Sequence, residues 1–193
     1  MFTQMYHILF GMIFLISIAN CKLNSFQDPS DDDIEQVEDQ RGSTAQFEDE
    51  LLQAHNRYRA RHCVSPLRLD NSLNRLAQNY AEQLAESNGR SQNRPQGLGQ
   101  NLYMKSTFGA ANSIRGVDAA SEWYRGSRSY NYGRGGFSME TGSFTQMVWK
   151  NSRSLGVGLA YTSDGQTAHV VAFYSPAGNF GNDYEDNVFP DQC

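Results

Sequence analysis

Cysteine is scarce in this chain, which has three among 193 residues, at positions 21, 63 and 193. Three cysteines exclude a second intramolecular disulfide and leave one thiol over if a first one forms. We expect the bridge to join Cys63 to Cys193, because Cys21 lies in a charged leader; the other pairings remain open alternatives. The sequence also lacks any Asn-x-Ser/Thr sequon, so N-glycosylation is not expected.

A long apolar run is missing as well. The most apolar stretch, Ile8–Ala19, covers 12 residues, whereas a bilayer span needs about 20. This length favours a secretory signal over residues 1–20 and argues against a stable membrane span, although the region before the run has no Lys or Arg. We therefore predict a protein secreted to the extracellular space, with an uncleaved anchor as the alternative.

Acidic residues are concentrated in the leader that follows. Between Asp28 and Glu50 there are ten acidic residues and one basic residue, whereas Leu51–Cys193 has eleven acidic and fourteen basic residues. A run of like charges with few aromatic residues is typical of a solvated, disordered segment, which we assign to residues 21–46. The alternative is an intramolecular cover for a basic face. No basic cluster with interleaved aromatic residues occurs, so nucleic-acid binding is not expected.

The domain begins with helical periodicity. Apolar positions at Phe47, Leu51, Ala54 and Tyr58 predict a helix over Phe47–Arg61. A second helix follows Asp70, its expected N-cap, and ends at Gly89. We expect three of its side chains on the buried face: Leu76, Tyr80 and Leu84.

Further along, the period changes from helix to strand. A third helix is predicted over Ser113–Arg128 and a short one over Gly142–Trp149. Alternation over Leu155–Tyr161 and the Val- and aromatic-rich segment Ala168–Tyr174 predict two strands, joined by a turn at Asp164–Gly165. Helices first and a hairpin last indicate an α+β fold, not alternating βαβ units.

Several ordered motifs resemble those of the CAP superfamily of cysteine-rich secretory, antigen 5 and pathogenesis-related 1 proteins. They are His55–Arg59, Asn74–Ala81, Gly99–Leu102, Trp123–Tyr124, Gly142–Trp149, Val170–Asn179 and Asp186–Pro190. The low cysteine count is most similar to the Golgi-associated pathogenesis-related branch. The resemblance implies a CAP (SCP-like) domain over residues 47–193, folded as an α-β-α sandwich with a small antiparallel sheet between helical layers.

Members of this family commonly place two His and two Glu in a central cleft, where the His pair can hold zinc. By the resemblance, the two Glu positions fall on Gln100 and Gly126, and one His position falls on Ser143. The other His belongs in the loop before Gly99, and no histidine occurs between His62 and His169. The resemblance therefore predicts a degenerate cavity with no metal, no cofactor and no catalytic residue.

A hydrolase that uses a site outside the family pattern is the alternative. Ser143, His169 and Glu122 can be written as a triad, although nothing in the sequence aligns them. The simpler expectations are a helix-supporting or surface role for Glu122, a hydrogen-bonded core role for His55, a turn position for His62 and a strand-face position for His169.

The segment between the third predicted helix and the motif Gly142–Trp149 is aromatic and rich in glycine. In the resemblance, Tyr130, Tyr132 and Phe137 correspond to a segment implicated in lipid and sterol contact; packing of these rings under the loop is the alternative. Nearby cations at Arg115, Arg125, Arg128 and Arg134 would attract anionic groups or remain solvated. We predict a secreted, non-enzymatic protein that binds a lipid, a sterol or a protein partner, with a purely structural role in a secretion as a further alternative.

Overall fold

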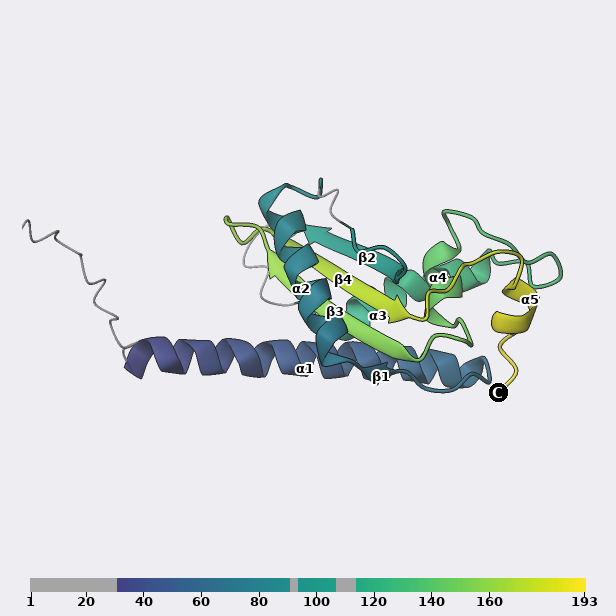
Figure 1. Ribbon diagram of the computed structural model, residues 1–193, viewed down its shortest axis with the longest axis horizontal. Helices are drawn as coiled ribbons and strands as arrows, with labels where there is room; N and C mark the ends of the chain where they lie inside the picture. The colour runs from purple at the N-terminus through teal and green to yellow at the C-terminus, as the bar shows by residue number, and fades with distance from the viewer. Residues whose placement is uncertain (1–30, 91–93, 107–113) are drawn as a thin grey trace, which may run out of the picture.

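The computed structural model describes residues 31–90, 94–106 and 114–193, with the course of the main chain alone for residues 31–43. A sheet lies between two helical layers (Figure 1). The elements are α1 (Asp31–Arg61), β1 (Arg68–Leu69), α2 (Asn71–Glu86), β2 (Gly99–Ser106), α3 (Gly116–Tyr124), the 3-10 helix η1 (Arg125–Arg128), α4 (Gly142–Met147), β3 (Ser154–Tyr161), β4 (Thr167–Ser175) and α5 (Tyr184–Asn187). The predicted α+β sandwich is confirmed.

The sheet has four strands in the order β1-β3-β4-β2. The hairpin partners β3 and β4 are antiparallel, and β2 pairs antiparallel with β4 over its whole length. The two residues of β1 run parallel to β3, so the sheet is mixed and not purely antiparallel as predicted. The sequence did not predict β2, because it is an edge strand with exposed Leu102 and Met104 on one face and therefore lacks a core pattern.

Helix α1 begins at Asp31, well before the predicted start at Phe47. The helix therefore runs through residues 31–46, where we expected a disordered leader; residues 1–30, including the predicted signal, lie outside the described part. No proline interrupts residues 31–61, and acidic residues at the start suit the positive end of a helix dipole. The predicted stripe is confirmed by the burial of Phe47, Leu51 and Ala54.

Helix α2 covers one face of the sheet, and α1 and α3 cover the other (Figure 1). Its N-cap is Asp70, whose side chain accepts hydrogen bonds from the main-chain N–H groups of Ser72 and Leu73, as predicted. Tyr80 and Leu84 are buried, but Leu76 is 41% exposed, so its predicted burial is wrong. The buried stripe instead runs through the alanines next to Tyr80 and Leu84, where α2 lies on β3.

Arg59 joins the last turn of α1 to the segment around the end of α4. Its side chain is fully buried and donates hydrogen bonds to the main-chain carbonyls of Ser65, Met147, Trp149 and Ser152. Burial lowers the pKa of the guanidinium to about 10, so it stays charged at neutral pH. The three bonds to Met147, Trp149 and Ser152 fix the end of α1 against the end of α4 and the segment that follows it.

No helix in the described part of the chain is long and apolar enough to cross a bilayer.

Candidate functional site

The beginning of β2, the 3-10 helix η1 and helix α4 meet at one end of the sheet. The Asn101 side-chain amide on β2 donates to the main-chain oxygen of Ser143 on α4, at 2.9 Å. A Cβ added at Gly99 would lie 2.0 Å from the side-chain oxygen of Gln146, so this glycine lets α4 approach the strand closely. The structure therefore brings Gln100 and Ser143 onto neighbouring elements.

Gly126, in η1, packs against Phe144 of α4 and against the two residues just before that helix. A Cβ at this position would lie 2.8 Å from the main-chain oxygen of Glu140 and 3.1 Å from both Phe144 Cβ and Thr141 Cα. Main-chain atoms form two of these three contacts and cannot turn aside as a flexible side chain would. The position has no space for a side chain in this packing, and certainly none for a carboxylate.

Gln100 and Ser143 offer neutral side chains. Gln100 lies on the opposite face of β2 from Asn101 because strand side chains alternate, and its Nε2 atom is buried without a hydrogen-bond partner among the described residues. An amide, a hydroxyl and a glycine provide none of the imidazole or carboxylate ligands that zinc prefers. Zinc chemistry does not fit this donor set. Over residues 44–90, 94–106 and 114–193, the structure has no group of three His, Cys, Asp or Glu side chains suited to a metal.

His55 is a core residue, as the sequence predicted. Its Nδ1 lies 2.8 Å from the Leu51 carbonyl and its Nε2 lies 2.7 Å from the Tyr174 hydroxyl. A carbonyl only accepts, so Nδ1 carries the proton and Nε2 accepts from Tyr174. Burial lowers the pKa of His55 to about 4, and the ring is neutral at pH 7.

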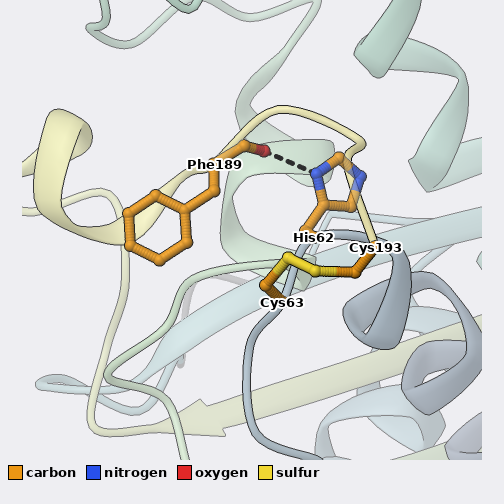
Figure 2. The surroundings of a disulfide bond; sticks show 4 residues. All are labelled: His62, Cys63, Phe189 and Cys193. Carbon is orange, nitrogen blue, oxygen red and sulfur yellow. Dashed lines mark hydrogen bonds between the residues drawn. A yellow bond between two sulfur atoms is a disulfide. The ribbon is translucent and has the colours of Figure 1, made fainter.

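His62 has the same tautomer in a second buried network. Its Nδ1 donates to the Phe189 carbonyl at 2.6 Å, and its Nε2 lies 2.8 Å from the Tyr124 hydroxyl. Burial lowers its pKa as well. Figure 2 shows His62 beside the disulfide that joins Cys63 to Cys193, which is the pairing we predicted.

The carboxyl-terminal tail closes over this end of α1. The main-chain N–H groups of Gln192 and Cys193 donate to the Arg61 carbonyl, and Arg61 forms an ion pair with Asp191. Together with the disulfide and the His62–Phe189 bond, these contacts hold residues 189–193 on the domain (Figure 2).

The structure does not assemble the triad of Ser143, His169 and Glu122. His169 pairs with Met104, three residues further along β2 than Asn101, which corresponds to about 10 Å of strand. Its ring lies near Gly89 beyond the end of α2, and burial lowers its pKa. The Glu122 carboxylate is exposed and forms an ion pair with Arg125 at 2.8 Å. Ser143 therefore has neither His169 nor Glu122 as a hydrogen-bond partner.

The aromatic loop divides into a packed part and an exposed part. Tyr130 is buried and Tyr132 is half-buried, and both rings contact Phe144. Phe137 is 60% exposed. The alternative of rings packed under the loop is therefore correct for the two tyrosines and wrong for Phe137.

Two further exposed apolar side chains belong to segments that contact Gly142, as Phe137 does, and sequence reasoning missed both. Met139 is 91% exposed and Phe180 is 74% exposed. All three belong to segments attached to Gly142: its N–H donates to the Ser138 carbonyl, its carbonyl accepts from the Asn179 side chain, and the Phe137 ring lies over its Cα. We call Phe137, Met139 and Phe180 the apolar tip; their two segments lie at the same end of the molecule, beyond α4 (Figure 1).

The comparison with known proteins identifies the family. The model of the cysteine-rich secretory protein family, CAP, matches residues 52–174. The chain belongs to the CAP family. It is 42% identical over 156 residues to human Golgi-associated plant pathogenesis-related protein 1, covering 78% of this chain and 97% of that protein. It is also 31% identical to pathogenesis-related protein 1 of Arabidopsis thaliana, covering 69% of this chain and 78% of that protein.

Other relatives are longer than this CAP domain. Protein PRY2 of Saccharomyces cerevisiae is 33% identical over 145 residues, which cover 75% of this chain and 41% of that protein. Among solved structures, NaASP2 with Zn2+ has a TM-score of 0.63 at 23% identity, covering 77% of this chain and 88% of that one. This likeness establishes the CAP fold and leaves the ligand of this chain to be argued from its own residues.

Proposed function

We propose that this chain is a secreted, non-enzymatic CAP-domain protein whose apolar tip binds an uncharged lipid of the sterol type. The observation that carries the proposal is the exposure of Phe137, Met139 and Phe180 around one buried glycine. A soluble domain gains nothing by leaving such side chains in water, since burial of each one is worth about 1.5–3 kcal/mol.

The charges beside the tip favour an uncharged ligand. Arg134, Glu140 and Asp183 flank the two segments and are all exposed. They give no excess of positive charge that would attract an anionic headgroup. A sterol presents a large apolar body with a single hydroxyl, which matches an apolar surface whose flanking charges carry no positive excess.

The proposal of a non-enzymatic protein rests on the degenerate cavity. Gln100 and Ser143 are neutral, and a side chain at Gly126 would collide with the main chain of Glu140. A carboxylate or imidazole is what moves a proton or holds zinc in such a cleft, and none stands at these positions. In this proposal the residues at the cavity positions pack the domain, and the apolar tip binds the ligand.

Flotation with vesicles tests the proposal. The protein is mixed with phosphatidylcholine vesicles with and without cholesterol, and its fraction in the floating layer is measured. We expect cholesterol-dependent binding by the native chain, and its loss when Phe137, Met139 and Phe180 are all changed to Ser. The matched control changes Leu102 and Met104 to Ser, because these are exposed apolar residues on β2, away from the tip.

Equal binding by the tip variant and the β2 variant would contradict the assignment of the tip. Binding to neither vesicle would contradict the lipid proposal and direct the search to a protein partner of the same surface.

Secretion is tested separately by expressing the chain with and without residues 1–20 in eukaryotic cells and measuring the protein in the medium. We expect secretion only with residues 1–20 present.

A further inference from the structure

A hollow in the surface lies apart from both the apolar tip and the degenerate cavity positions. It has a volume of about 750 Å³ and is formed by α1, β2, α3 and η1. Neither the residues of the tip nor Gln100, Gly126 or Ser143 line it. We call it the basic pocket.

One wall of the basic pocket is aromatic and rigid. The rings of Tyr58 on α1 and Tyr124 on α3 are stacked, with centroids 3.9 Å apart and planes 15° from parallel. The Tyr124 hydroxyl is held by His62 Nε2 at 2.8 Å, and the Tyr58 hydroxyl lies 3.4 Å from the Ser121 hydroxyl. The guanidinium of Arg61 lies 5.2 Å from the centroid of the Tyr124 ring. This wall is fixed before any ligand arrives, which lowers the entropic cost of binding.

The charged residues that line the pocket are unequal in number. Four of them are cations and two are carboxylates: Arg61, Lys105, Arg125, Arg128, Asp118 and Glu122. Both carboxylates are already paired, because Glu122 lies 2.8 Å from Arg125 and Asp118 lies 3.6 Å from Lys105. Arg61 is paired with Asp191 on the carboxyl-terminal tail.

Arg128 is the cation that remains. It is exposed and has no carboxylate within 4.0 Å in the described part of the chain. It follows Ser127, which also lines the pocket and whose side chain is hydrogen-bonded to Tyr124 of the aromatic wall, so Arg128 lies next to that wall in the sequence. A planar guanidinium with several N–H donors matches the oxygens of a phosphate or sulfate group.

We propose that the basic pocket binds a small ligand through a phosphate or sulfate group that Arg128 contacts directly. The lining has more cations than carboxylates and therefore attracts the anion. The tyrosine wall limits the ligand to one side of the pocket. Phosphate chemistry has two sources, a soluble phosphorylated molecule or the headgroup of an anionic phospholipid, and both present the same oxygens to Arg128. The site is independent of the sterol proposal because it shares no residue with the tip.

Calorimetric titration with pyrophosphate at low ionic strength tests the site. We expect saturable binding by the full chain, weakened about tenfold or more by Arg128→Gln, since a charge-assisted hydrogen bond is lost. Arg90→Gln is the matched control: it removes the same charge from an exposed arginine that does not line the pocket, and binding should be unchanged. Glu122→Gln should strengthen binding severalfold, because it removes a carboxylate and frees Arg125.

Two outcomes would overturn the proposal. One is the absence of saturable pyrophosphate binding by the native chain, and the other is equal weakening by Arg128→Gln and Arg90→Gln, which would mean long-range attraction without a site. Flotation with phosphatidylcholine vesicles containing phosphatidic acid separates the two sources. If the protein binds these vesicles, and if both added pyrophosphate and Arg128→Gln abolish that binding, the ligand is a phospholipid headgroup. If the protein binds pyrophosphate and does not bind the vesicles, the ligand is a soluble phosphorylated molecule.

Discussion

Replacing Gly126 by Ala tests directly whether the cavity position is closed. The added Cβ would lie 2.8 Å from the Glu140 carbonyl oxygen and 3.1 Å from Phe144 Cβ and Thr141 Cα. A separation below 3.0 Å requires movement, and the nearest atom belongs to the main chain. Overpacking of a buried position costs about 1–3 kcal/mol.

The unfolded state offsets part of that cost. An alanine restricts the unfolded chain more than a glycine does, which stabilises a protein by about 0.4–1 kcal/mol where the site tolerates it. We therefore expect Gly126→Ala to lower the free energy of unfolding by about 1–2 kcal/mol. Urea denaturation at pH 7, with the slope compared between variants, measures this change.

The chain provides a matched control in Gly133. A Cβ there would meet only the Asn131 side-chain oxygen, at an ordinary contact distance of 3.5 Å. Gly133→Ala should leave stability unchanged or raise it slightly. If Gly126→Ala proves as stable as Gly133→Ala, the position is open and the argument for a closed cavity fails.

Three further predictions concern stability and protonation. Leu84 is 5% exposed and Leu76 is 41% exposed, so Leu84→Ala should lower the free energy of unfolding by about 2–5 kcal/mol and Leu76→Ala by much less; equal losses in urea denaturation would contradict the observed face of α2. The disulfide between Cys63 and Cys193 closes a separation of 130 residues, so changing both cysteines to Ser should cost about 2–5 kcal/mol in the same assay; an unchanged unfolding midpoint would show that the tail holds without it. His55 has a pKa of about 4 in the folded chain and an ordinary value of about 6.5 when unfolded. The unfolded state therefore binds more protons between these pH values, and the stability contributed above pH 6.5 is lost as pH falls towards 4, by about 3 kcal/mol at most; a ring titration midpoint near 6.5 by NMR would refute the buried assignment.

The sequence predicted the elements that pack on a core along their whole length. The stripe of α1 was predictable because one face of the helix packs on a continuous core, and the hairpin of β3 and β4 was predictable because its apolar residues pack on the cores on both faces of the sheet. Asp70 could be predicted as the N-cap of α2, because its side chain accepts hydrogen bonds from main-chain N–H groups only two and three residues away. The family motifs predicted the overall fold, and the family match confirms it.

The sequence did not predict features that depend on packing between residues far apart in the chain. The face of α2 that carries Leu76 lies off the sheet, and periodicity alone cannot tell the centre of a helical stripe from its margin. Met139 and Phe180 are 41 residues apart in number, and Gly142 forms hydrogen bonds with the segments that carry them. A pattern such as an aromatic next to a glycine-rich loop could have suggested Phe180, which lies between Asn179 and Gly181.

The candidate site shows the same division. Gln100 and Ser143 could be named from motifs, and their neutral character is visible in the sequence. The closure at Gly126 could not, because it results from the main chain of residues 140 and 141 folding back on η1. The basic pocket was also hidden, since its lining comes from four elements spread between Tyr58 and Arg128.

Native mass spectrometry of the protein purified from a secreting eukaryotic cell, with metal content determined on the same sample, tests the central claim most directly. The account predicts a metal-free protein that carries a neutral lipid, and loss of that lipid when the three residues of the apolar tip are changed to Ser. Stoichiometric zinc would contradict the degenerate cavity, and a lipid retained in full by the tip variant would contradict the binding site.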